Sequence, residues 1–220
     1  MDQATIKRLV EEVVRELTSQ QAAQPTGGGV STMTAASAGH LTISETGDAA
    51  HGTDPKEVVI GLSPAFSTII HETIIGVPHA RALKEICAGI EEEGLKYRFI
   101  RLYKTADVGF ITHEAAKLSG SGIGIGLQSR GTTVIHQKDL PPLSNLELFS
   151  QSPLIDEETF RAIGKNAAKY AKGENPTPVP VRNDQMARPK YQAIAALLHN
   201  KETTLVDLSK KAQGLQISFG

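Results

Sequence analysis

Hydrophobic and polar positions follow a helical period in the first eighteen residues of the chain. Ile6, Leu9, Val13 and Leu17 recur at steps of three and four, so they form one apolar stripe on a helix, and charged side chains take the opposite face. Because charges interrupt the apolar residues at every turn, the segment is unlike a secretory signal. Such a helix commonly packs on its own domain, but the sequence that follows favours docking on a partner.

Residues 19–56 contain few side chains that could form a core. They are rich in Gly, Ser, Thr, Ala and Gln, which cannot offset the entropy lost on ordering, so this segment is expected to be flexible. A short isolated helix is marginal in water and forms fully only when a partner covers its stripe. The pattern therefore predicts a docking helix (1–18), a flexible linker (19–56) and a folded domain (57–220).

Apolar runs alternate with amphipathic segments from residue 57 onward. A strand followed by a helix and another strand is typical of parallel strands joined by crossover helices. We therefore expect a three-layer α/β/α sandwich with a mostly parallel, mixed sheet. Strands are predicted at 57–63, 97–103, 123–129 and 132–137, helices at 80–94, 108–118, 156–173 and 191–200, and two short apolar runs that close the sheet or its edge at 203–208 and 215–219.

The composition is that of a soluble globular protein of 220 residues, with 40% hydrophobic side chains and 23 basic against 24 acidic residues. No apolar run approaches the roughly 20 residues that span a bilayer, and no basic excess would attract nucleic acid. A lone cysteine, Cys87, allows no internal disulfide and no Cys-rich metal site, and it favours a reducing, cytosolic environment. We therefore expect no membrane, nucleic-acid or metal binding.

The glycine-rich segment between Gly120 and Gly131 contains five glycines in twelve residues. The spacing of a dinucleotide-binding G-x-G-x-x-G fails in every register, and Thr132 stands where a P-loop needs lysine. Alternating glycines leave one face of a strand without side chains, so either a ligand approaches the backbone or a helix of the same chain packs there. Both alternatives stay open.

The turn that follows the glycines offers groups suited to a phosphate. Arg130 provides a guanidinium, Gly131 a backbone N–H and Thr132 a hydroxyl. The alternative for Arg130 is a solvated turn residue. Farther along, residues 139–149 combine two prolines, a polar Ser-Asn pair and exposed apolar side chains, so this segment is either a loop packed on its own core or one side of a pocket.

The acidic side chains and histidines do not assemble into an active site. The acids are scattered without a spacing that pairs two of them for acid–base catalysis, and the spacing of His71 and His79 fits no zinc pattern. The sequence also lacks a nucleophile elbow and an H-E-x-x-H motif. We therefore expect no catalytic residues in this chain.

Several sequence blocks, in order, resemble the medium (beta) subunit of adenosylcobalamin-dependent diol and glycerol dehydratases. They include EVVIGLSPAF, LSGSGIGIGLQSRGTTVIHQ, LPPLSNLELFSQSPL and NDQMARPKYQA, and the resemblance covers about residues 57 to 205. It implies a non-catalytic subunit of a propanediol dehydratase that converts 1,2-propanediol to propionaldehyde, or alternatively of a glycerol dehydratase that forms 3-hydroxypropionaldehyde. Its partners would be a catalytic TIM-barrel large subunit and a small subunit in an (αβγ)2 heterohexamer.

The same resemblance implies that adenosylcobalamin is clamped between this chain and the large subunit. Arg130 would bind the nucleotide-loop phosphate, and many relatives have lysine at this position. The geometry of this contact would therefore differ from that in those relatives, because a guanidinium binds a phosphate through two parallel N–H groups, whereas an ammonium acts as a point charge. The implied contacts are Asp107 with a corrin amide arm, Arg130 and Thr132 with the phosphate, Leu143 and Asn145 with the ring amides, and Ser150 and Arg188 as further contacts.

The N-terminal segment resembles an encapsulation peptide. This implies that residues 1–18 bind a shell protein and place the chain in the lumen of a bacterial microcompartment. Two competing hypotheses come from other classes of protein. One is a self-sufficient small-molecule enzyme that holds a nucleotide phosphate in the glycine-rich loop, and the other is a scaffold in which the helix is an adaptor.

Overall fold

The computed structural model describes residues 41–220; the predicted docking helix (1–18) and the first part of the predicted linker (19–40) lie outside the described residues. Elements along the described chain follow the expected alternation. They are β1 Leu41–Asp48, β2 Glu57–Leu62, α2 His79–Glu92, β3 Lys96–Arg101, α3 Val108–Leu118, β4 Ile123–Leu127, β5 Thr133–Gln137, β6 Glu147–Phe149, a 3-10 turn Ser152–Leu154, α4 Glu157–Ala171, α5 Ala187–Thr203 and β7 Gln213–Phe219.

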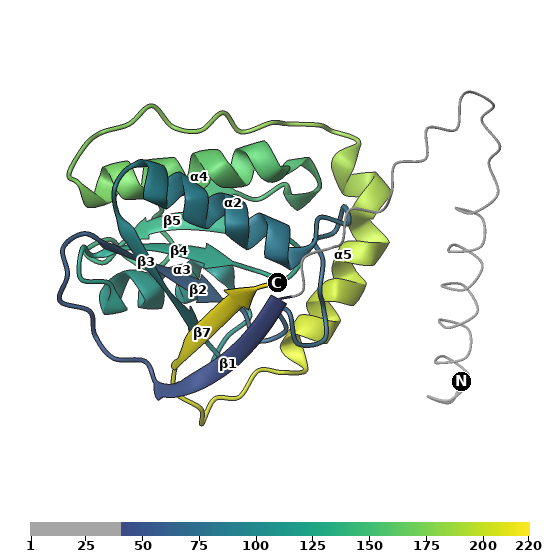
Figure 1. The fold of residues 1–220 in the computed structure, drawn as a ribbon. Coiled ribbons are helices and arrows are strands. Elements are labelled where there is room, and N and C mark those ends of the chain that lie inside the picture. The colour runs from purple at the N-terminus through teal and green to yellow at the C-terminus, as the bar shows by residue number, and fades with distance from the viewer. Residues whose placement is uncertain (1–40) are drawn as a thin grey trace. The chain divides into compact units, whose positions relative to one another are not determined.

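The strands within residues 41–220 form one mixed sheet of seven strands in the order β1-β7-β3-β2-β4-β5-β6. The predicted α/β class with a mixed sheet is therefore confirmed (Figure 1). Parallel pairing is confined to β3-β2-β4, where α2 and α3 provide the crossovers, so the expectation that the sheet is mostly parallel is wrong. A turn too short for a crossover joins β4 to β5, so that pair is antiparallel, as are β5-β6, β3-β7 and β1-β7.

Helices cover the two faces of the sheet unequally. On one face, Val58, Ile60 and Leu62 of β2 join a large buried cluster with α2 and α4. On the other face, Val59 of β2 packs with Ile111 of α3 in a smaller cluster. Because side chains alternate along a strand, the unbroken apolar run of β2 serves both layers. The result is a sandwich with α2 and α4 above the sheet and α3 below it (Figure 1).

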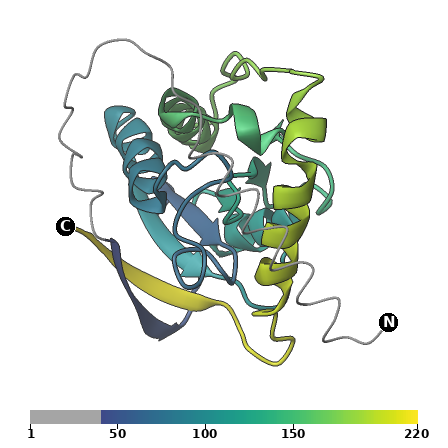
Figure 2. The same cartoon turned by 90° about the vertical axis from the view of Figure 1, so that its right-hand side faces the viewer.

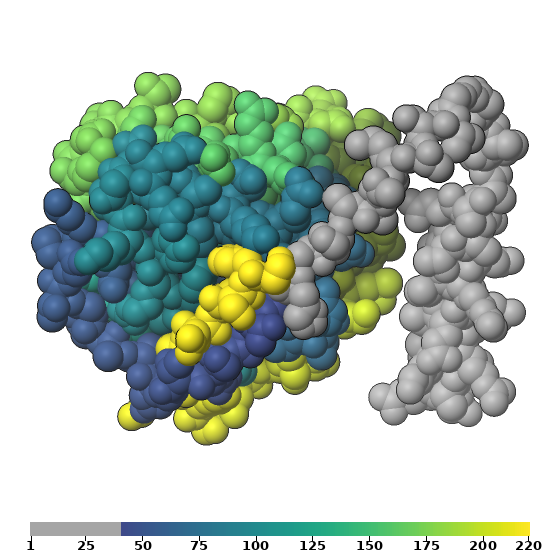
Figure 3. All heavy atoms as spheres, in the orientation of Figure 1, coloured from purple at the N-terminus to yellow at the C-terminus, as the bar shows by residue number. Residues whose placement is uncertain are grey.

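The C-terminal half of the predicted linker belongs to the folded domain. Leu41–Asp48 forms edge strand β1, which pairs antiparallel with β7 from the other end of the chain (Figure 3). Leu41 and Ile43 alternate with polar residues over only a few positions, which is a weak signal for a strand. Ile217, the residue that pairs with Ile43, lies far away in the sequence. In contrast, the apolar run predicted at 203–208 forms no strand, because it ends α5 and continues into turns.

Two glycines allow α2 and α4 to cross at backbone contact. A Cβ placed on Gly89 would overlap Arg161 O, and one on Gly164 would overlap Ile86 O and lie 3.2 Å from Gly89 Cα. Two apolar helix faces can approach this closely only where no side chain separates them. This crossing closes the large core above the sheet.

The substitution Gly164→Ala should destabilise the fold by about 1–3 kcal/mol because the new methyl group overlaps the α2 backbone. Helix propensity alone predicts the opposite sign, since alanine is favoured over glycine by about 1 kcal/mol in a helix. Urea unfolding of the wild type, Gly164→Ala and the exposed control Glu158→Ala would measure the difference. An unchanged or higher midpoint for Gly164→Ala would contradict the tight crossing.

Candidate functional site

The carboxyl ends of the three parallel strands meet at one edge of the sheet. Strands β3 and β4 lie on opposite sides of β2 and are reached through helices on opposite faces. The strand order therefore reverses between β2 and β4, and in open α/β sheets ligands bind in the crevice at such a switch point. This edge is the candidate site.

The turn from β4 to β5 carries Arg130 at this edge. The backbone reverses at Gly131, whose φ of 104° is in the region that favours glycine. Arg130 Nε donates to Gln128 Oε1 at 3.1 Å and to Thr132 Oγ1 at 3.0 Å. Burial lowers the pKa of Arg130, and the negative charge of Glu202 opposes this effect. Both bonds are made by Nε, so neither of them uses the two terminal nitrogens of the guanidinium.

His79, at the start of α2, holds the same turn through a hydrogen bond to Ser129. Its Nδ1 accepts the Ser67 backbone N–H at 3.1 Å, so the proton is on Nε2, which donates to Ser129 O at 2.7 Å. The ring stacks on Phe66 at 3.7 Å between centroids. Burial lowers the pKa of His79 to about 4, so the imidazole is neutral at neutral pH. His79 is therefore a structural residue rather than a metal ligand.

Three of the seven predicted site residues line one cavity of about 430 Å³. Arg130, Ser150 and Arg188 come from the β4–β5 turn, the end of β6 and the start of α5. Two guanidinium groups in one cavity suit an anionic group such as a phosphate. Thr132 acts on this cavity through Arg130, because its hydroxyl accepts a hydrogen bond from Arg130 Nε and so helps to orient that side chain.

The other three predicted residues lie around α3 and the loop before β6. Asp107 caps α3, accepting from Gly109 N at 2.8 Å and Phe110 N at 3.3 Å. A Cβ on Gly109 would lie 3.7 Å from Leu143 Cδ2, so Leu143 covers the first turn of the helix. Asn145 Oδ1 is buried without a hydrogen-bond partner in the described part of the chain. The structure thus gives Asp107 a structural role of its own.

The glycine-paved face of β4 is covered by a helix of the same chain. A Cβ on Gly124 would lie 2.5 Å from Ala116 N, and one on Gly126 would overlap Thr112 Oγ1, both in α3. Of the two alternatives for these glycines, helix packing is therefore correct. The residues at the edge fit a phosphate, but the bare strand face is not open to a corrin ring. Binding of adenosylcobalamin by the seven residues stays a prediction.

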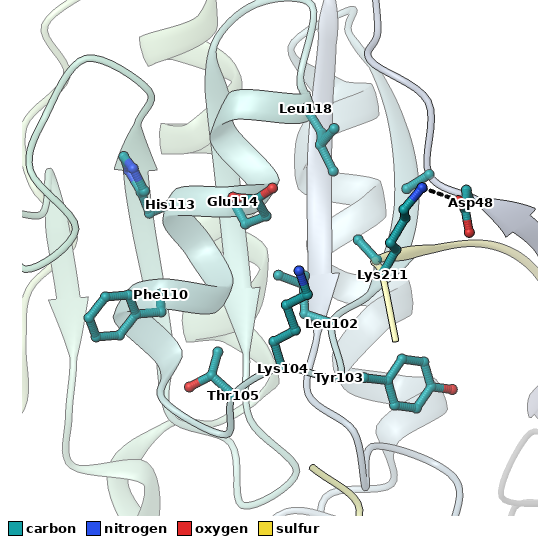
Figure 4. Close-up of a pocket in the computed structure, with 12 residues that line it drawn as sticks. Asp48, Leu102, Tyr103, Lys104, Thr105, Phe110, His113, Glu114, Leu118 and Lys211 are labelled. Atoms are coloured by element: carbon teal, nitrogen blue, oxygen red, sulfur yellow. Dashed lines mark ion pairs between the residues drawn. The ribbon is translucent and has the colours of Figure 1, made fainter. Parts of the chain in front are cut away.

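A larger cavity of about 780 Å³, which the sequence did not suggest, lies beside α3 (Figure 4). Phe110, His113 and Glu114 line it from α3, with Lys104 from the loop after β3. At its rim Lys211 forms an ion pair of 3.2 Å with the carboxylate of Asp48. These residues come from three distant parts of the sequence, so no local motif could reveal the cavity.

Within residues 41–220, no group of three or more metal-ligating side chains comes together. In the same part of the chain, every helix is too short or too polar to cross a membrane.

The pH dependence of stability should report the buried neutral His79. Its pKa in the folded chain lies below the ordinary value of 6.5, so the unfolded chain takes up the proton first as the pH falls. Stability contributed by the neutral ring is therefore lost between about pH 6.5 and pH 4, by about 3 kcal/mol at most. Chemical unfolding at several pH values should show a shallower decline for His79→Gln than for the wild type; parallel declines would contradict this role.

Comparisons with known proteins connect the chain to the dehydratase system. The family model described as "Dehydratase medium subunit" matches residues 63–177, just over half of the chain. The diol dehydratase-reactivating factor small subunit of Klebsiella michiganensis is 33% identical over 90 residues, which are 41% of this chain and 69% of that protein. The propanediol dehydratase-reactivating factor small subunit of Citrobacter freundii is 37% identical over 89 residues, which are 40% and 73% respectively.

Among solved structures, "Glycerol dehydratase reactivase" superposes with a TM-score of 0.45 and 23% identity, covering 54% of this chain and 94% of the other. A diol dehydratase-reactivating factor complexed with ADP and Mg2+ gives a TM-score of 0.41 and 25% identity, covering 59% and 99%.

These relatives correct two expectations and confirm a third. The prediction that the chain is the medium subunit of a propanediol dehydratase, or alternatively of a glycerol dehydratase, is wrong, because the matched proteins are small subunits of reactivating factors. The (αβγ)2 heterohexamer with large and small dehydratase subunits is wrong for the same reason. The connection to the diol dehydratase system is confirmed. The chain belongs to the dehydratase medium subunit family, and two curated proteins similar to it are small subunits of dehydratase-reactivating factors.

Proposed function

We propose that this chain is the small subunit of a factor that reactivates a diol-type dehydratase. The observation that carries the proposal is its identity of 33% and 37% to two such subunits over more than two thirds of their length. Its partners would then be a larger subunit of the same factor and the dehydratase itself.

The exposed apolar side chains near the start of α3 are suited to contact with such a partner. Leu143 is 74% exposed and Phe110, in the first turn of α3, is 47% exposed. Leu143 lies against Gly109, the residue that precedes Phe110 in the first turn of the same helix. Large apolar groups that stay exposed on a folded domain commonly mark interaction sites. We propose that this pair contacts the dehydratase or the larger subunit.

The proposal is tested by separating assembly of the dehydratase from its repair. Dehydratase subunits purified without this chain should be active at first, lose activity during turnover, and regain it when the chain is added with its larger subunit. The measurement is product formation over time, with the chain or the larger subunit omitted in control reactions. A dehydratase that is inactive from the first turnover unless it contains this chain in stoichiometric amount would contradict the proposal.

Leu143→Ser should weaken the complex with the larger subunit or the dehydratase without unfolding the domain. Loss of a partly buried leucine at an interface costs about 1–2 kcal/mol, so binding should weaken by roughly 5- to 30-fold. Leu208→Ser is a matched control, since Leu208 is 77% exposed in the segment before β7. Titration of reactivation against the concentration of each variant would show whether Leu143 is distinguished from Leu208; equal behaviour would place the interface elsewhere.

Encapsulation through residues 1–18, and with it a place in the lumen of a microcompartment, stays a prediction, because this segment lies outside the described residues.

A further inference from the structure

Helix α5 is attached to the domain mainly near its two ends. Ala187 at its start and Glu202 near its end are its buried residues, whereas Ile194 is 44% and Leu197 is 40% exposed in its middle. The helix stands beside the carboxyl edge of the sheet (Figure 2). A helix that serves only the core would bury its apolar side chains and expose its charges. In α5 the charged Glu202 is buried, whereas the apolar Ile194 and Leu197 are exposed.

The buried end of α5 inserts a carboxylate into the switch-point crevice. Glu202 is 3% exposed, and its two oxygens are bound to two different loops. Oε1 accepts from Ala65 N at 2.8 Å, after β2, and Oε2 accepts from Ser129 N at 3.1 Å, after β4. Backbone N–H groups at the carboxyl ends of adjacent parallel strands are the groups that hold ligand anions in doubly wound folds. Glu202 therefore lies where such a ligand anion would lie.

The guanidinium of Arg130 lies at the same crevice and forms no ion pair with any residue between 41 and 220. Arg130 and Glu202 line it together with Gln128 and His199, and Arg130 also lines the cavity of about 430 Å³. One side chain, Arg130, therefore borders both Glu202 and a cavity large enough for an organic group. Two N–H donors and a guanidinium are a donor set for phosphate or carboxylate oxygens.

If the carboxylate of Glu202 left the crevice, few buried polar groups would lose their only hydrogen-bond partner. Ser129 N also donates to Ser63 Oγ at 3.1 Å, so it keeps an acceptor when the carboxylate leaves. Ala65 N would lose its acceptor, and an incoming oxygen could replace it. The carboxylate itself would gain solvent, which stabilises an ionised group. The contact is therefore suited to exchange.

We propose that the crevice between Ala65, Ser129 and Arg130 is an anion-binding site, that Glu202 occupies it as an intramolecular ligand, and that a small molecule bearing a phosphate or carboxylate group displaces Glu202 and releases α5. Because an internal competitor lowers apparent affinity by the fraction of time that it occupies the site, the wild type should bind such anions weakly. The inference is independent of the proposed function, since neither the larger subunit nor the dehydratase takes part.

The test measures binding of inorganic phosphate and of acetate to the full chain by calorimetry. Glu202→Gln keeps the size of the side chain but removes its charge, so phosphate affinity should rise about 10-fold or more once the competitor is weakened. Glu158→Gln is the matched control, because it removes the same charge from an exposed position in α4 and should leave the affinity at the wild-type value. The probe that binds more tightly to Glu202→Gln identifies the class of anion.

Hydrogen exchange on the wild type provides a second readout that does not require the variant to fold. Saturating phosphate should accelerate exchange of the α5 amides by about 10-fold, as the last turn is released, and leave those of α4 unchanged. Unchanged exchange in α5, together with a Glu202→Gln affinity equal to that of the wild type, would overturn the proposal and make Glu202 a permanent structural link.

Discussion

The carboxyl edge of the sheet depends on how Ser129 is held. Its carbonyl accepts from the neutral ring of His79, and its N–H is shared between Ser63 Oγ and the carboxylate of Glu202. These bonds join α2, the loop after β2, the β4–β5 turn and α5 at one residue. Because the groups are buried, a polar atom that loses all of its bonds has no water to replace its partner. The position of Arg130 follows from this network.

Glycines decide where on the sheet a ligand can lie. Gly124 and Gly126 bring α3 into contact with β4, and Gly89 and Gly164 do the same for α2 and α4. Both faces of the central strands are therefore closed by helices of the same chain. The open positions are the carboxyl edge, where two guanidinium groups share a cavity, and the region of the sheet beside α3. Close packing of the layers thus moves the candidate site from a face of the sheet to its edge.

The family resemblance identified the domain but assigned it to the wrong protein. The matched family region covers residues 63–177, which include the glycine-rich segment and the loop before β6 on which the assignment to a dehydratase subunit depended. Such sequence blocks indicate a fold. Both a dehydratase subunit and proteins similar to reactivating factors contain a domain with this fold. The fold does not show which assembly the chain joins, because a fold that is shared by several proteins does not specify the partners of each one.

The sequence by itself determined the elements whose period is local. The apolar run of β2, the stripe of α2 and the acidic first turn of α4 each depend on neighbours a few residues away, so these elements were predicted close to their observed bounds. Only the tertiary structure decided that Leu41–Asp48 is a strand, since β7 supplies its hydrogen bonds, and that Arg130 and Arg188 line one cavity. Pairing and cavity formation join residues that are distant in the chain, and no local pattern records which of them will meet.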